Sequence, residues 1–416
     1  MPGAVSQPST GAWGKAKRAP EIDRLGLAFG ESPSHQPLAS VLEKLLVRRA
    51  TPLLVVRLIV AALLTAVSVQ PAAAAEPRYV IHISVDGLRS DAITTLGPAV
   101  LPNFYRLRRE GAVTDNARTD YGWTITLPNH TSQLTSRPVN GPSGHQYIAN
   151  KDPDPGATLE TNAGSYVASV FDVVHDHGLR TALFSGKTKF VIYEQSYNAR
   201  TGARDVTGAD NGRKKIDAFV INRKSSKLVS AYVQAMADRP FEYSFVHLVD
   251  PDTTGHARTW DLTTSPRSAY LDAVQAVDGC LGTILQMIDT TPALKSHTTI
   301  LLTTDHGGEL TTRSHRAAIK ADNYIIPFYA WGAGVTRGDL YLLNPTTRRD
   351  PRRLRPDYSE AVQPIRSGEM ANLALKLLGL PAVPGSTINA AQDLRVSQAT
   401  TLNAAKTSRK GAGAAH

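Results

Sequence analysis

The chain of 416 residues has the composition of a globular protein, with 42% hydrophobic and 20% charged residues, and is long enough for one large domain or two smaller ones. Eight of the 46 Lys and Arg residues and four of the 36 Asp and Glu residues precede Glu76, which leaves the rest with a surplus of six positive charges. This surplus is not gathered with aromatic residues, which argues against a nucleic-acid polymer as the main partner. A single cysteine, Cys280, excludes an intrachain disulfide and a zinc site built on several cysteines.

Residues 1–75 are expected to be an N-terminal extension that ends in a secretory signal peptide. Two adjacent arginines precede an apolar core from Leu58 to Val69, and Ala73 and Ala75 form the small-residue pattern of a cleavage site. The core is shorter than the roughly 20 residues that span a bilayer, which disfavours the alternative of a membrane anchor. We therefore expect bacterial-type export, cleavage after Ala75, and a secreted, periplasmic or cell-surface protein without a stable membrane anchor.

Residues 76–395 have the pattern of one α/β domain. Runs rich in β-branched and aromatic residues predict strands at Tyr79 to Val85, Thr181 to Phe184, Tyr243 to Val249, Thr298 to Thr304 and Ile325 to Trp331. Helical patterns lie between them at Leu101 to Glu110, Tyr166 to His177, Lys227 to Ala237 and Ala269 to Ile288. This alternation predicts a mainly parallel sheet with helices on both faces. We expect residues 191–223 to be a small insertion over the site and residues 396–416 to be a disordered tail.

Acidic and histidine side chains follow three of the predicted strands. In open α/β sheets, ligands gather at the carboxyl ends of the strands, so we expect these side chains to lie close together. They supply three carboxylates and three imidazoles: Asp86, Asp252, Asp305, His256, His306 and His315. Carboxylate oxygens and imidazole nitrogens suit Zn²⁺, and six ligands exceed what one tetrahedral ion needs. The sequence therefore predicts a site for two zinc ions.

The stretch T-L-P-N-H-T from Thr126 to Thr131 supplies the candidate nucleophile. Pro128 interrupts regular structure, and a helix that starts here would leave the Thr126 hydroxyl near its N-terminus, where backbone N–H groups favour an anion such as phosphate. A threonine hydroxyl is a weak nucleophile at neutral pH, and coordination to a divalent ion would activate it. Two ions about 3.5–4 Å apart, with Thr126 between them, suit in-line displacement at phosphorus.

Together these motifs resemble the alkaline phosphatase superfamily, and most closely its type I phosphodiesterase/nucleotide pyrophosphatase family. The matching segments, in the family's order, are V-D-G-L at Val85, T-x-P-N-H at Thr126, P-D-x-x-G-H at Pro251 and D-H-G-G at Asp305. The resemblance implies an alkaline phosphatase-like three-layer sandwich with a mainly parallel central sheet. It also implies Thr126 as the nucleophile in contact with two zinc ions, one held by Asp252, His256 and His315 and the other by Asp86, Asp305 and His306.

The resemblance extends to residues that hold the substrate. The family places an Asn five residues after a His downstream of the nucleophile, as His145 and Asn150 are placed here, so we expect Asn150 to donate to a phosphoryl oxygen. The same loop departs from the family, because Gln146 stands where a Gly is usual. Lys187 and Lys189 are similar to a Lys-x-Lys of phosphonoacetate hydrolases that contacts the substrate, and the alternative is a solvated strand end.

The resemblance implies a hydrolase of small phosphate-containing substrates, and the predicted signal peptide implies its export. The T-x-P-N-H motif favours a phosphodiesterase or nucleotide pyrophosphatase, with an alkaline phosphomonoesterase or a phosphonate hydrolase as alternatives. A sulfatase is disfavoured, because that chemistry needs a Cys or Ser in a C/S-x-P-x-R motif where this chain has Thr126. A binding protein on an inactive enzyme scaffold is disfavoured because the sequence retains every expected ligand and the nucleophile.

Overall fold

A computed structural model describes residues 76–207 and 212–398, and the structural statements below concern these ranges. The predicted signal peptide and residues 399–416 of the predicted tail lie outside them. Val396, the first residue of that tail, is buried, and its carbonyl accepts a hydrogen bond from the backbone N–H of Thr336 at 2.9 Å, so it is part of the folded domain. Within the described ranges, no helix combines the length and hydropathy that crossing a bilayer requires.

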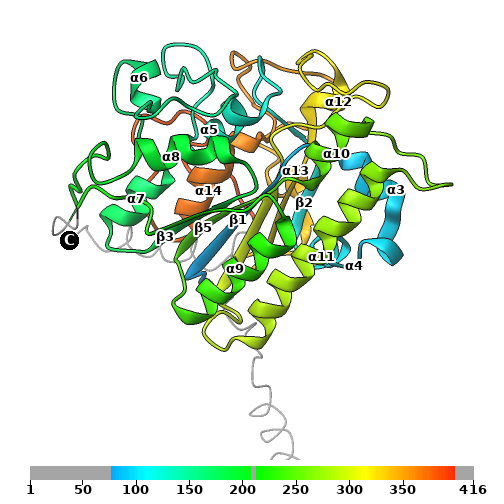
Figure 1. Ribbon diagram of the computed structural model, residues 1–416, viewed down its shortest axis with the longest axis horizontal. Helices are drawn as coiled ribbons and strands as arrows, with labels where there is room; N and C mark the ends of the chain where they lie inside the picture. The colour runs from blue at the N-terminus through cyan, green and yellow to red at the C-terminus, as the bar shows by residue number, and fades with distance from the viewer. Residues whose placement is uncertain (1–75, 208–211, 399–416) are drawn as a thin grey trace, which may run out of the picture. The chain divides into compact units, whose positions relative to one another are not determined.

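An eight-stranded sheet forms the centre of the domain, in the order β4-β3-β5-β1-β6-β7-β2-β8 (Figure 1). The strands are β1 (Tyr79–Val85), β2 (Ala112–Arg118), β3 (Thr181–Ser185), β4 (Ala218–Ile221), β5 (Tyr243–Leu248), β6 (Thr298–Thr303), β7 (Ile325–Gly332) and β8 (Gly338–Asp339). Strand β7 is antiparallel to both of its neighbours, and all other pairs are parallel. The predicted α/β class and the mainly parallel sheet are confirmed.

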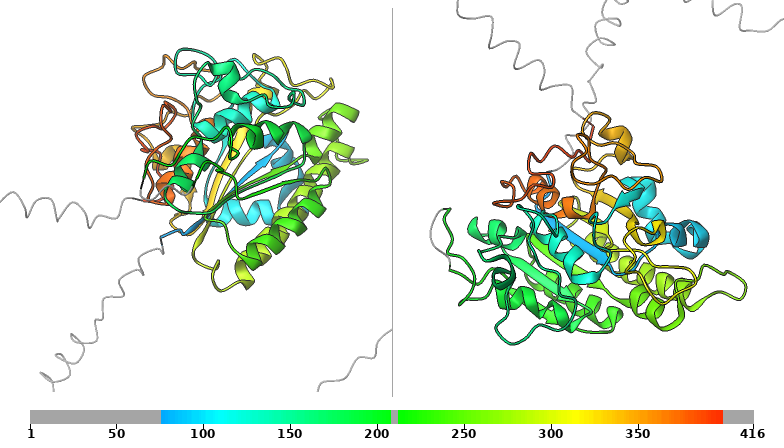
Figure 2. Two further views of the ribbon diagram at one scale, coloured as in Figure 1. Left: turned by 60° about the vertical axis from the view of Figure 1, so that its left-hand side comes forward. Right: turned by 90° about the horizontal axis from the view of Figure 1, so that it is seen from above.

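Helices cover both faces of the sheet, which gives three layers (Figure 2). Alternation along β1 separates two cores, because Ile81 and Ile83 pack on one face and Val80 packs on the other. The first face is covered by α3 (Ser90–Val100), α4 (Pro102–Glu110), α9 (Ser225–Asp238) and α11 (Ala269–Thr290). The second is covered by α5 (Thr126–Thr135), α7 (Val170–Asp176) and α14 (Met370–Leu377).

The five predicted strands are present as β1, β3, β5, β6 and β7, and the four predicted helices as α4, α7, α9 and α11. Helix α7 begins four residues later than predicted, because Ser169 and Asp172 form a capping box that starts the helix at Val170. The segment 191–223 is not only a loop over the site, since it contains α8 (Val191–Ser196) and β4. Strand β4 pairs with β3 and forms one edge of the sheet.

The strand order positions the functional site. Strands β5, β1 and β6 are adjacent and parallel, so their carboxyl ends share one edge of the sheet. Asp86 directly follows β1, α10 (Asp250–Arg258) follows β5, and Asp305 follows β6. Helix α5 begins at Thr126 on the face of the sheet that carries α7 and α14. Four segments that are far apart in the sequence therefore meet at one place.

Candidate metal centre and active site

The first predicted ligand set forms a compact group. Asp252 and His256 lie one turn apart on α10, and His256 Nε2 is 3.4 Å from Asp252 Oδ1. His315 comes from the loop after β6, and its Nε2 atom is 3.7 Å from the same carboxylate oxygen and 3.1 Å from His256 Nε2. The other ring nitrogen of His315 lies 2.5 Å from the carbonyl of Thr124, which turns Nε2 toward the group. One ion could be held between these three side chains.

The second predicted set lies beside the first and shares contacts with it. His306 Nε2 is 3.1 Å from Asp305 Oδ2, 3.6 Å from Asp86 Oδ1 and 3.9 Å from Asp252 Oδ1. One potential ion-binding group therefore consists of Asp86, Asp252 and His306, with Asp305 against the histidine, and Asp86 also forms such a group with His130 and His247. The rings of His306 and His315 stack with centroids 3.5 Å apart, so the two sets form one continuous cluster.

The donor atoms of this cluster fit divalent cations. Four of them are buried without a hydrogen-bond partner, namely Asp86 Oδ1, Asp252 Oδ1, Asp305 Oδ2 and His306 Nε2. Only eleven side-chain atoms in the described ranges are buried without a hydrogen-bond partner, so such atoms are concentrated in this cluster. Burial of unpaired polar atoms costs free energy, and three buried carboxylates would repel one another unless positive charge lies between them.

Part of that positive charge comes from Lys187. Its ammonium nitrogen lies 2.7 Å from Asp86 Oδ2 and 2.6 Å from Asp252 Oδ2. Burial opposes protonation of Lys187, but the surrounding carboxylates outweigh it and raise the pKa of the ammonium above its ordinary value. Burial alone would raise the pKa of the Asp86 carboxyl, but Lys187 and His247 hold that pKa well below its usual range. The cluster is thus built around ionised carboxylates.

The imidazoles of the cluster differ in protonation. Burial, followed by the nearby positive charge of His306, lowers the pKa of His315 to about 2, so this ring is neutral as a metal ligand must be. Burial also acts against the charge on His306, but Asp305 and Asp86 raise its pKa to about 9. A divalent ion bound by these carboxylates would therefore displace a proton from His306.

Thr126 stands beside the cluster with its side chain buried. Its Oγ1 atom lies 3.5 Å from the ammonium of Lys187. Ile125, at the N-cap of α5, provides no side-chain cap, and Pro128 has no N–H, so the first turn offers the backbone N–H groups of Thr126 and Leu127 to other acceptors. One of them is already used, because the backbone N–H of Leu127 donates to Asn150 Oδ1 at 3.0 Å. The Thr126 hydroxyl thus lies near the Lys187 ammonium, near side chains that could bind metal ions, and at the positive end of a helix dipole.

Asn150 and Lys189 form a pair next to the nucleophile. The Lys189 ammonium donates to Asn150 Oδ1 at 2.8 Å, so this oxygen accepts hydrogen bonds from both Lys189 and the Leu127 amide. Within the described residues the Asn150 Nδ2 group donates no hydrogen bond, and it is free for an acceptor on a substrate. Asn150, Lys187 and Lys189 line the same cavity, of about 550 Å³.

His247 is a site residue that the sequence analysis missed. The Gly186 backbone N–H donates to His247 Nδ1 at 3.3 Å, so the ring proton resides on Nε2, which donates to Asp86 Oδ2 at 2.9 Å. This contact fixes the orientation of a predicted ligand, as partners of metal-bound side chains do. The signal was present in the sequence, because His247 interrupts the buried apolar strand β5 with a polar side chain.

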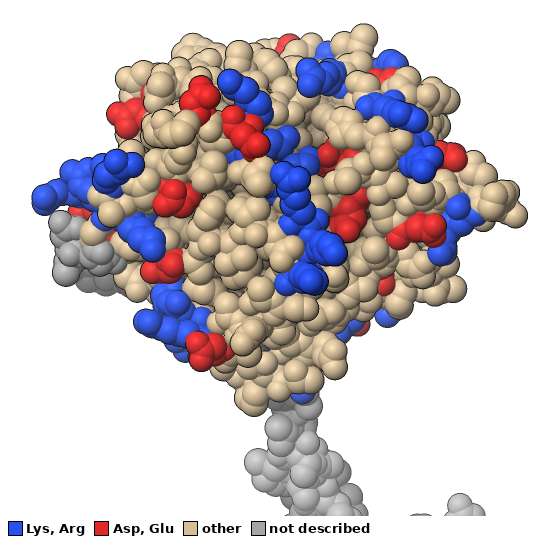
Figure 3. All heavy atoms as spheres, in the orientation of Figure 1, with Lys and Arg blue, Asp and Glu red and all other residues tan. Residues whose placement is uncertain are grey.

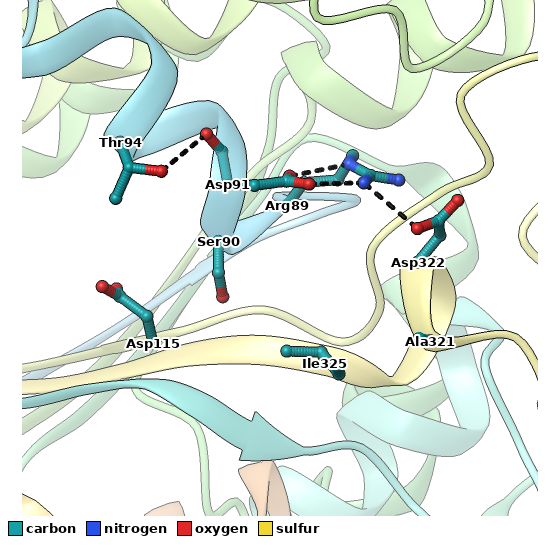
Figure 4. Close-up of a pocket in the computed structure, with 8 residues that line it drawn as sticks. All are labelled: Arg89, Ser90, Asp91, Thr94, Asp115, Ala321, Asp322 and Ile325. Carbon is teal, nitrogen blue, oxygen red and sulfur yellow. Dashed lines mark hydrogen bonds and ion pairs between the residues drawn. The ribbon is translucent and has the colours of Figure 1, made fainter. Parts of the chain in front are cut away.

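Arg89 and Trp260 were also missed, and both connect the ligand-bearing loops. Arg89 is buried, donates to the carbonyl of Gly308, and forms ion pairs with Asp91 at 2.6 Å and Asp322 at 3.2 Å (Figure 4). The adjoining cavity, of about 320 Å³, is lined by none of the predicted ligands. The indole N–H of Trp260 donates to the carbonyl of Gly87 at 3.0 Å, which ties the end of β1 to α10.

This arrangement suits hydrolysis at phosphorus. A hydroxyl at a helix N-terminus, buried carboxylates and imidazoles are the groups that hold metal ions and an oxyanion during displacement at a phosphoryl centre. The predicted nucleophile and all six predicted ligands lie together at the carboxyl edge of the sheet, while Asn150 and Lys189 lie in the adjoining cavity.

Comparison with known proteins agrees with this description. The profile of the family described as type I phosphodiesterase/nucleotide pyrophosphatase matches residues 80–380. No curated protein matches the sequence. Murine ectonucleotide pyrophosphatase/phosphodiesterase 5 is similar in structure with a TM-score of 0.50 and 14% identity, over 76% of this chain and 99% of that chain.

Two further solved structures are similar. One is an inactive threonine-to-alanine variant of the same murine protein in complex with AMP, with a TM-score of 0.50, 15% identity, and coverage of 76% of this chain and 99% of that chain. The other is a 2-O glycosaminoglycan sulfatase, with a TM-score of 0.51 and 13% identity over 78% of this chain and 75% of that chain. At these identities the likeness concerns the fold, which is the alkaline phosphatase-like sandwich.

Proposed function

Because this chain belongs to the type I phosphodiesterase/nucleotide pyrophosphatase family, we propose that it is a two-zinc phosphodiesterase in which Thr126 is the nucleophile. One observation carries the proposal. The buried Thr126 hydroxyl begins α5 beside a cluster of carboxylates and imidazoles whose buried donor atoms have no partner. Attack by a hydroxyl on a phosphoryl group requires loss of its proton and neutralisation of oxygen charge, and both needs are met by such a cluster.

The proposed ligand sets follow the family pattern. Asp252, His256 and His315 would hold one zinc, and Asp86, Asp305 and His306 the second. When bound, the ions would lower the pKa of the Thr126 hydroxyl and neutralise charge on the phosphoryl oxygens. The contacts of Asp252 with both sets support a paired centre, in which the two ions would act on one substrate.

Thr126 Oγ1 attacks phosphorus and forms a Thr126–phosphorus ester, and the bond to the leaving alcohol breaks. The proton lost by the threonine ends on that alcohol. A water molecule then attacks the same phosphorus, releases the phosphate monoester and restores the hydroxyl. Asn150 Nδ2 donates to a phosphoryl oxygen, together with the backbone N–H of Thr126 at the start of α5.

Lys187 and Lys189 are proposed to contact the anionic substrate. Lys187 lies within reach of Thr126, and Lys189 is held next to Asn150, so both can contact the phosphoryl group or its substituents. This lysine pair also favours a second candidate function, hydrolysis of phosphomonoesters or phosphonates, because these substrates carry more negative charge than a diester. Sulfatase chemistry receives no such support, since Thr126 occupies the position of the nucleophile.

The proposed setting is outside the cytoplasm. The N-terminal pattern of arginines, apolar core and Ala73-x-Ala75 supports bacterial-type export. A small phosphate ester is proposed as the substrate rather than a nucleic-acid polymer, because the basic residues are not gathered with aromatic residues. No stable membrane anchor is expected after cleavage.

The experiment compares bis-p-nitrophenyl phosphate with p-nitrophenyl phosphate and phosphonoacetate, using zinc-loaded protein that begins at Glu76. A phosphodiesterase hydrolyses the diester with the highest kcat/KM, and Thr126→Ala lowers this rate at least a thousandfold while zinc binding is retained. Preference for the monoester or the phosphonate would assign the second function. Full activity of Thr126→Ala, or zinc content well below two per chain at saturation, would contradict the proposed centre.

A further inference from the structure

A cavity of about 550 Å³ opens beside the nucleophile. Lys187 lines it and approaches Thr126 Oγ1 to 3.5 Å, while Asn150 lines it and accepts a hydrogen bond from the Leu127 amide. A substituent on a phosphoryl group at Thr126 would therefore extend into this cavity. Its lining determines which substituents the enzyme accepts.

Positive charge dominates the lining. Four cationic side chains and one acidic side chain border the cavity: Lys151, Lys187, Lys189, Arg223 and Asp152. They come from three separate segments, the loop after α5, the turn after β3 and the loop before α9. In Figure 3, Lys and Arg side chains form a column on the face where Figure 1 places the N-terminal end of α9. The convergence of separate segments indicates a common ligand.

Two of these cations have no carboxylate partner within the described residues. Lys189 donates to the neutral Asn150 amide alone, and burial together with nearby Lys187 lowers its pKa to about 8, which leaves it mostly charged at neutral pH. Arg223 is exposed, makes no hydrogen bond or ion pair with another described residue, and lies two residues before α9, whose first turn has no acidic residue. A cation at the positive end of a helix is unfavourable in isolation. Asp250 already faces this terminus, because its carboxylate accepts a hydrogen bond from the Ser225 hydroxyl in the first turn of α9. An anion in the cavity would compensate the charges of Lys189 and Arg223.

The cavity also lacks what a nucleobase would need. Its lining, as far as the described residues form it, contains no aromatic side chain. Stacking of bases on aromatic rings is a main contribution to affinity in proteins that bind unpaired nucleotides. The cationic groups can bind a compact anion more favourably than a flat, neutral base.

We infer that this cavity is a subsite for a second anionic group of the substrate, a carboxylate or phosphate separate from the phosphoryl group that is cleaved. Lys189 and Arg223 bind that group, with Lys151 at the rim. The inference rests on the proposed function for the identity of the cleaved bond. An enzyme with this subsite differs from a nucleotide-selective enzyme, because it selects substrates by the charge on the substituent rather than by a base.

The test uses three p-nitrophenyl phosphodiesters that share the leaving group and the cleaved bond. Their second substituents are 2-carboxyethyl, propyl and thymidine-5′-yl. We expect zinc-loaded enzyme to prefer the carboxyethyl ester over the propyl ester by about tenfold or more in kcat/KM, since one charge-assisted hydrogen bond is worth at least that ratio. Arg223→Gln and Lys189→Gln each lower this preference at least threefold. The matched control Lys227→Gln, which removes an exposed cation from α9 outside the cavity, leaves the preference as in the wild type.

Equal rates for the carboxyethyl and propyl esters, the highest rate for the thymidine ester, or a preference that survives both cavity substitutions would overturn the inference. If no ester is hydrolysed, the proposed function fails, and binding then decides the subsite separately. Calorimetric titration compares 3-phosphonopropionate with propylphosphonate, which contain no phosphoester bond. Tighter binding of the carboxylate-bearing compound by about tenfold, lost in Arg223→Gln, supports the subsite, and equal binding rejects it.

Discussion

At the scale of single residues, the orientation of Asp86 depends on His247. The amide of Gly186 leaves the ring only one way to place its proton, and that proton points at the Asp86 carboxylate. The carboxylate oxygen that does not accept this bond is the one buried without a partner. His247 therefore directs one oxygen of Asp86 toward a bound ion and holds the other.

Replacement of His247 by Phe is expected to weaken zinc binding by about 10–100-fold, the usual effect of removing a partner of a ligand. His247→Gln, which keeps an N–H donor, should recover part of the loss. The measurement is a competition titration with a chromogenic zinc chelator, which needs no substrate. Wild-type zinc affinity in the Phe variant would show that Asp86 is oriented by other contacts.

Single residues also define how far the sequence could predict the site. The ligands Asp86, Asp252 and Asp305 were identifiable because each lies in a motif at the end of a predicted strand. The ammonium of Lys187 between two of these carboxylates was not, because the direction of a long side chain in a turn depends on tertiary charge. The same limit applied to His247, whose only sequence signal was a polar residue in an apolar strand.

At the scale of elements, Trp260 packs between the two ligand-bearing segments that follow β5 and β6. A Cβ atom on Gly308 would lie 2.1 Å from the indole ring, and one on Gly255 of α10 would lie 2.3 Å from it. The ring is fully buried, and its indole N–H bonds the carbonyl of Gly87. Glycine at these two positions lets the helix and the loop approach Trp260 closely, which keeps their ligands together.

Gly308→Ala should therefore destabilise the protein by about 1–3 kcal/mol, since the buried ring has no space to yield. The control is Gly279→Ala on the exposed side of α11, where a Cβ meets no atom within 4 Å. This change should stabilise by up to about 1 kcal/mol, because alanine favours a helix more than glycine does. Urea unfolding measures both, and equal midpoints for the two variants would contradict the packing argument.

The elements that the sequence analysis missed share a physical cause. Strand β2 reads A-V-T-D-N-A-R, with several half-buried polar residues, and its strand conformation follows from pairing with β7 and β8. Strand β4 has only four residues inside a polar segment and depends on pairing with β3. Strands with strong apolar runs, such as β1 and β6, were predictable because burial on both faces requires those residues.

At the scale of the whole molecule, the topology of the sheet creates the site. The order β5-β1-β6 brings Asp252, Asp86 and Asp305 to one edge although they are up to 219 residues apart in the chain. The sheet class was predictable from the alternation of strands and helices. The reversed strand β7 was not, because strand direction is set by the connections and by pairing partners rather than by local composition.

The central claim is that Thr126 forms a covalent bond to the phosphorus of the substrate. Rapid acid quenching of zinc-loaded enzyme during turnover of bis-p-nitrophenyl phosphate, followed by peptide mass spectrometry, tests it most directly. The account predicts a phosphorus adduct on the peptide that contains Thr126, absent from Thr126→Ala. Steady turnover without any adduct on this peptide, or an adduct on another residue, would contradict it.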